Sequence, residues 1–95
     1  MEDEVVIPKE ARLRYIERRK NDIDCLRSAL ATQTFAEFTR IGHQLKGNAA
    51  SFGYKDLEKV AIELERAGQQ QDSAEAAKQL NLFENWLTQV LDQVS

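Results

Sequence analysis

Residues 34–53, TFAEFTRIGHQLKGNAASFG, contain a start signal, a helical period and a stop signal for one helix. Thr34 with Glu37 three residues later has the pattern of a capping box. Gly53 suits the left-handed conformation just past a helix end. The apolar residues between them recur at the spacings of one helix face, namely Phe38, Ile41, Leu45, Ala49 and Phe52. We therefore predict an amphipathic helix from Thr34 to about Phe52.

The same period occurs on both sides of this stretch. It predicts a helix over about residues 9–31, a second over about residues 55–70, and a last one that opens at the capping-box pattern of Asp72 and Glu75. The expected core positions of these three helices are Leu13, Ile16, Ile23, Leu26 and Leu30, then Leu57, Val60, Ala61 and Leu64, then Leu80, Phe83, Leu87, Val90, Leu91 and Val94.

No stretch of the chain alternates polar and apolar residues over the length of a strand. Because the links between the predicted helices are only a few residues long, neighbouring helices must run in opposite directions. The expected fold is all-α, an antiparallel up-down four-helix bundle. Residues 1–8 are expected to form a frayed N-terminal segment and residues 9–95 the bundle domain.

Composition limits the classes of function. The 95 residues carry a formal net charge of -3, which argues against nucleic acid as the main partner. No apolar run approaches the ~20 residues of a membrane span. The single cysteine, Cys25, fits a reducing compartment and is expected to be a small buried or half-buried thiol. We expect a cytoplasmic protein that binds neither nucleic acid nor membrane.

His43 is the only histidine of the chain, and it lies opposite the apolar stripe of its helix. At about 100° per residue, Ile41 and Leu45 fall about 160° and 200° from it, so the imidazole should face solvent. A lone surface histidine is ordinarily without function. Gly47 changes that view, because a mid-helix glycine costs about 1 kcal/mol relative to alanine and here leaves room for a partner to approach. The His43 side also carries Thr39, Arg40, Lys46, Gly47 and Ala50.

These residues favour phosphoryl chemistry. A neutral imidazole is a good nucleophile near pH 7, and the Lys46 ammonium can pair with phosphoryl oxygens. The chain has no glycine-rich phosphate loop and no evident aspartate cluster for Mg²⁺. It can hold a phosphoryl group but shows no means of binding ATP.

His43, Leu45, Lys46, Gly47, Ala49 and Gly53 match a pattern that resembles the histidine-containing phosphotransfer (HPt) domains of multistep phosphorelays. Leu57, Leu64, Glu65 and Asp72 fit the downstream spacing of that family, and the resemblance runs from the segment at Tyr15 through the last helix. It implies a bundle whose exposed His43 accepts a phosphoryl group from the phospho-aspartate of a response-regulator receiver domain and passes it to another.

The resemblance also implies the division of labour between the two proteins. The receiver supplies Mg²⁺ and most of the catalytic groups, so this chain is expected to be a phosphocarrier, without a cofactor of its own and not itself an enzyme. Glu65 matches the position that hydrogen-bonds the imidazole in many members. Docking is expected on the His43 face through Arg40, Gly47 and Ala50 together with the neighbouring first helix. A monomer that works with one or more receivers, and with a hybrid histidine kinase in some arrangements, is expected.

Other classes of function remain open at this point. A helical adaptor that binds a signalling partner without chemistry is the main alternative. The phosphoacceptor hairpin of a sensor kinase is disfavoured by Gln44 and by the absence of a nearby proline. Basic residues between positions 12 and 20 are interleaved with acidic ones, which favours a salt-bridged surface over a nucleic-acid patch. One histidine without clustered ligands is too few for a metal site.

Overall fold

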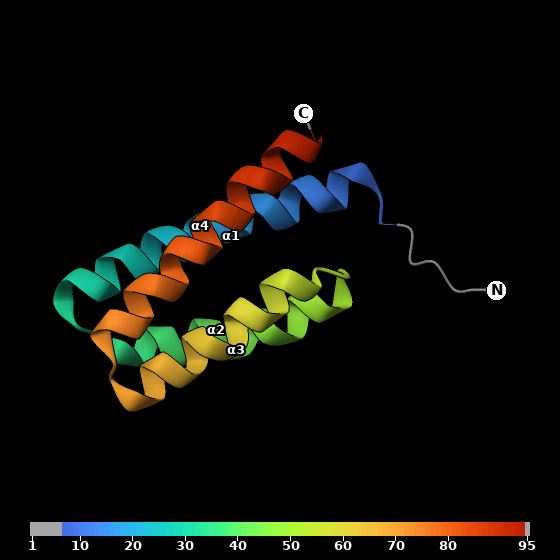
Figure 1. Cartoon of the computed structure of the whole chain (residues 1–95). Coiled ribbons are helices and arrows are strands. Elements are labelled where there is room, and N and C mark those ends of the chain that lie inside the picture. The colour runs from blue at the N-terminus through green and yellow to red at the C-terminus, as the bar shows by residue number, and fades with distance from the viewer. Residues whose placement is uncertain (1–6, 95) are drawn as a thin grey trace.

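The computed structural model describes residues 7–94, and four helices account for nearly all of them (Figure 1). They are α1 (Lys9–Thr32), α2 (Phe35–Ser51), α3 (Lys55–Gln70) and α4 (Ser73–Val94). The predicted frayed segment falls largely on residues 1–6, outside the described range. No helix within residues 7–94 has the length and apolar character to cross a membrane.

The four helices form the all-α up-down bundle that the sequence predicts, with no strand in the described part of the chain. The hairpin of α2 and α3 lies beside the longer pair of α1 and α4, which run on past the α2–α3 turn (Figure 1). The start of α1 and the end of α4 therefore lie at the same end of the bundle. Connections of a few residues impose this antiparallel order.

The core is a continuous apolar cluster contributed by all four helices. Its largest fully buried side chains are Phe38, Phe83, Leu26, Leu45, Leu57 and Leu64. Leu13 was expected in this core but is 43 % exposed. The buried stripe of α1 is centred on Tyr15, Arg19 and Leu26, so Leu13 falls outside it.

The two capping-box predictions have different outcomes. Asp72 Oδ1 accepts the backbone N–H of Glu75 at 3.0 Å, which confirms the cap of α4, although the Glu75 carboxylate turns to Gln79 instead of back to the cap. The prediction of a capping box at Thr34 is wrong. The Thr34 hydroxyl makes no cap bond and contacts Thr32 instead, and Glu37 pairs with Arg40. α2 thus begins at Phe35 without a side-chain cap.

Two glycines bring α2 and α3 into close backbone contact. A Cβ on Gly42 would lie 2.6 Å from the Glu65 nitrogen and 2.9 Å from the Ala61 oxygen. A Cβ on Gly68 would lie 2.6 Å from the Thr39 nitrogen. Neither distance is compatible with a side chain, so the absence of one at these two positions sets how closely α3 approaches α2.

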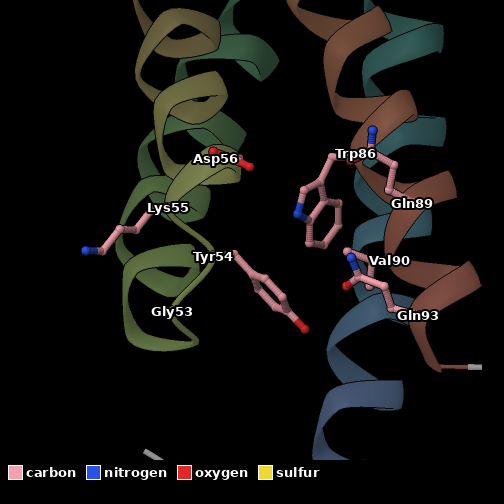
Figure 2. A pocket seen from close by; sticks show the side chains of 8 residues that line it. All are labelled: Gly53, Tyr54, Lys55, Asp56, Trp86, Gln89, Val90 and Gln93. Carbon is pink, nitrogen blue, oxygen red and sulfur yellow. The ribbon is translucent and has the colours of Figure 1, made fainter. Parts of the chain in front are cut away.

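The α2–α3 turn is fixed by aromatic stacking. Gly53 adopts the predicted left-handed conformation with φ of 79°, and the chain then places Tyr54 against α4. Figure 2 shows the Tyr54 ring pointing from the turn toward Trp86 and Val90. Tyr54 meets Trp86 edge-on at 5.2 Å between ring centroids. Trp86, which the apolar pattern did not single out, is a core residue of this end of the bundle.

Candidate functional site

The site is built by the middle of α2 and the facing turn of α3. His43 Nδ1 lies 3.0 Å from Glu65 Oε2, and Lys46 Nζ donates to Glu65 Oε1 at 3.1 Å. One carboxylate thus bridges the imidazole and the ammonium. The contact between Glu65 and the imidazole is the one that the family resemblance implies.

Gly42 is the reason the contact is so short. It directly precedes His43, and its missing side chain lets the α3 backbone at Glu65 press against α2. The sequence interpretation did not assign this residue a role. A signal was present in the pair of glycines, Gly42 and Gly47, on either side of His43, since two helix-weakening residues only five positions apart call for two explanations.

The side chains of His43, Lys46 and Glu65 differ in their exposure to solvent. The His43 side chain is 69 % exposed, that of Lys46 39 % and that of Glu65 only 16 %. The imidazole is therefore exposed to solvent, while the Glu65 carboxylate that it contacts is largely shielded between α2 and α3. When the Nδ1–H group donates a hydrogen bond to Glu65, the Nε2 lone pair is left free and points away from Glu65.

The charge of Glu65 is secured by its neighbours. The hydrogen bond from Lys46 lowers the pKa of Glu65 most, ahead of the opposing desolvation and the weaker contribution of His43. The carboxylate thus remains charged at neutral pH. A charged acceptor strengthens the hydrogen bond from the ring and favours positive charge on the imidazole during a reaction.

The other predicted site residues lie on α2 around His43, and none of them forms a side-chain hydrogen bond with the triad of His43, Lys46 and Glu65. Nothing lies within 4 Å of the place a Gly47 Cβ would take, so this glycine opens onto free space. Ala50 and Arg40 are exposed, as expected for a docking face. The Arg40 guanidinium is engaged with Glu37, which raises the pKa of Arg40 and leaves it less free to steer a partner than the sequence indicated.

Cys25 differs from its expectation. It was expected to be buried or half-buried, but it is exposed on α1. Its position follows Asp24 and precedes Leu26, and only Leu26 of these faces the core. The period of α1 therefore turns the thiol outward.

The recess beneath the α2–α3 turn is not part of this site. Gly53, Tyr54, Lys55, Asp56, Trp86, Gln89, Val90 and Gln93 line it (Figure 2). It contains neither His43 nor a residue of its triad, and its two aromatic rings belong to the core packing of the turn.

Comparison with known protein families identifies the family of this chain. A family model described as Hpt domain matches residues 10–93, nearly the whole chain. The chain belongs to the Hpt domain family. No curated protein and no solved structure matches it significantly. HPt domains serve phosphotransfer in two-component signalling and interact with receiver domains. The HPt fold here carries one histidine, which is exposed on α2 with its ring nitrogen against Glu65.

Proposed function

We propose that this HPt domain is a phosphocarrier whose His43 accepts a phosphoryl group from a receiver phospho-aspartate and passes it to another receiver. The observation that carries the proposal is the contact of 3.0 Å between Nδ1 of a largely exposed imidazole and the Glu65 carboxylate. This contact supplies a fixed ring orientation and a free Nε2 in one arrangement.

The step balances as a simple displacement. The Nε2 lone pair of His43 attacks phosphorus, the P–O bond to the aspartate breaks, and the aspartate leaves as a carboxylate with the electron pair. The Nδ1 proton stays on the ring, where the hydrogen bond to Glu65 stabilises the positive charge that develops. Transfer to the next receiver is the same displacement in reverse, with an aspartate oxygen as nucleophile.

Lys46 has two partners in this scheme. At rest its ammonium binds Glu65 at 3.1 Å and helps keep that carboxylate charged. Lys46 lies three residues after His43 on the same helix, so a phosphoryl group on Nε2 comes within its range. Its role is to pair with the phosphoryl oxygens as charge builds on them.

The receiver completes the chemistry. Mg²⁺ and the remaining catalytic groups come from the partner, so the chain needs no cofactor of its own and is a carrier without independent turnover. Arg40, Gly47 and Ala50 form part of the docking face, and the protein works as a monomer. A hybrid histidine kinase fits as the upstream source of the phosphoryl group.

The experiment that tests the proposal is a transfer assay. A panel of receiver domains is phosphorylated with acetyl phosphate and Mg²⁺, and each is mixed with the wild-type chain. At least one receiver is expected to give an acid-labile, alkali-stable phosphate on this chain, while ATP alone gives none. The alternative, an adaptor without chemistry, predicts receiver binding with no phosphate on the chain.

Removal of the Glu65 carboxylate tests the role of the triad. Glu65→Ala is expected to slow transfer by about tenfold or more, because the ring loses its orientation and its charge stabilisation. Labelling by phosphoramidate should slow as well, since the defect lies in the imidazole itself. Nitrogen chemical shifts of His43 should show a larger share of the tautomer with the proton on Nε2. Glu65→Gln, which keeps an oxygen acceptor, should recover part of the rate; unchanged rates and shifts in Glu65→Ala would refute the role.

A larger side chain at position 47 tests whether Gly47 provides the space that a receiver needs to reach His43. Gly47→Gln is expected to leave the protein folded, because the position opens onto free space and the helix gains a better former. Transfer from the receiver should fall steeply, since the new side chain stands about one turn from the imidazole. Labelling by the small reagent phosphoramidate should stay near the wild-type rate. A wild-type rate of receiver transfer in this variant would show that clearance is not the reason for the glycine.

A further inference from the structure

A groove runs between α1 and α2 on the side of Asn48. It is lined by Ala11, Arg14, Tyr15, Arg18 and Arg19 of α1 and by Asn48 and Phe52 of α2. Its floor is aromatic, because the Tyr15 and Phe52 rings stack at 4.2 Å between centroids. The groove therefore combines a rigid apolar floor with three arginines along one wall.

Asn48 fixes this groove by joining the two helices. Its Oδ1 accepts hydrogen bonds from the Tyr15 hydroxyl at 2.6 Å and from Arg19 Nη1 at 3.2 Å. Burial raises the pKa of Tyr15 to about 12, so the hydroxyl keeps the proton that this bond needs. The amide thus holds α1 in one register against α2 beside the groove.

Arg19 is part of that structure and is not available to a ligand. It is 7 % exposed, its guanidinium lies 4.4 Å from the Tyr15 ring centroid, and its Nε is 2.8 Å from Asp22 Oδ2. Its charge is therefore balanced inside the protein. Lys20 is likewise paired, with Glu17. The expectation of a salt-bridged surface is confirmed for Lys20, whereas Arg19 forms its ion pair while buried.

Arg14 and Arg18 are different. Both are exposed, and neither makes an ion pair or a side-chain hydrogen bond with any residue of the described range 7–94. No acidic residue lines the groove. In a chain of net charge -3, these two arginines place positive charge along the groove that no ion pair with another residue of 7–94 offsets.

The groove continues the His43 face. Gln44, Gly47 and Ser51 are exposed on α2 and lie about 100°, 40° and 80° around the helix from His43, while Asn48 lies at about 140°. By helical position these residues lie between the imidazole and the groove. The groove thus adjoins the His43 face along α2.

We propose that this groove receives an acidic segment of the receiver domain that docks on His43, with Arg14 and Arg18 as the residues that determine which receivers bind well. Carboxylates of that segment pair with the two guanidinium groups, and an apolar side chain packs on the Tyr15–Phe52 floor. The inference rests on the proposed phosphocarrier function and adds the chemistry of the partner to it. Charge matching at such a rim acts mainly on association and its salt dependence.

The test compares two charge-reversed variants with the receiver that donates fastest to wild type. Arg14→Glu with Arg18→Glu should lower the transfer efficiency by at least about tenfold. The loss should appear as a higher apparent KM for phosphorylated receiver, with little change in the maximal rate. The salt dependence of the rate should become shallower, and labelling by phosphoramidate should not change. Lys59→Glu with Lys78→Glu, exposed positions on α3 and α4 with the same change of net charge, is the matched control and should stay within about twofold of wild type.

The outcomes distinguish failure of the groove proposal from failure of the proposed phosphocarrier function. If wild type transfers and the arginine variant matches the control, the groove proposal is overturned while the phosphocarrier function stands. If no receiver labels wild type, both fail. Arg14→Gln with Arg18→Gln, which removes charge without reversing it, should give an intermediate KM. An equal effect of neutral and reversed variants would assign the loss to packing and overturn the electrostatic proposal.

Discussion

His43→Gln is expected to abolish acid-labile phosphate on this protein completely. The chain contains no second histidine, so no other imidazole can take the phosphoryl group. Glutamine keeps a polar side chain of similar length at an exposed position, and the fold should be unaffected. The measurement is incorporation of label from a phosphorylated receiver and, in parallel, from phosphoramidate.

Two controls make this prediction decisive. Circular dichroism and melting of His43→Gln should match wild type, and the variant should still bind the receiver. Lys46→Gln should retain measurable labelling by phosphoramidate, since it leaves the nucleophile in place. Label that persists on His43→Gln and survives alkali but not acid would place the phosphoacceptor elsewhere and end the assignment.

Gly42→Ala is expected to destabilise the fold although it adds only one methyl group to α2. The new Cβ would lie 2.6 Å from the Glu65 nitrogen and 2.9 Å from the Glu65 Cα, both in the backbone of α3. Backbone cannot turn aside as a flexible side chain can, so the helices must separate. Overpacking of this kind costs about 1–3 kcal/mol, which exceeds the gain of about 1 kcal/mol in helix propensity.

The matched control is Gly47→Ala, the same change on the same helix into open space. It should raise the melting temperature by about 4–8 °C, following the propensity gain of about 1 kcal/mol. Gly42→Ala should melt below wild type and should slow phosphotransfer, because Glu65 moves away from His43. Equal stabilisation by both substitutions would show that α2 and α3 do not approach as described.

The helices and the exposure of His43 could be predicted from sequence because both depend on local period. Apolar residues every three or four positions define a helix face, and the residue opposite that face is exposed whatever lies across the bundle. Glu65 was implied only by the family resemblance, and the structure shows its contact with the imidazole. Thr34 shows the limit of local patterns, since its capping signal is present but α2 begins there without the cap bond.

The packing between helices could not be predicted from helical period. Gly42 and Gly47 have the same propensity and stand five residues apart, yet one faces the α3 backbone and the other open space. Helical period places Asn48 off the His43 face, but its bonds to Tyr15 and Arg19 depend on where α1 lies. Those partners are 33 and 29 residues away in the chain.

The sequence by itself determined four amphipathic helices, their antiparallel order and an imidazole turned to solvent beside a lysine and a glycine. Only the tertiary structure decided that the Glu65 carboxylate joins His43 to Lys46, that Gly42 permits this approach, and that Arg14 and Arg18 lie along a groove without an ion pair to another described residue. The physical reason is that helical period fixes the direction of a side chain around its own axis. The distance and register between two helices arise from the packing of both surfaces together.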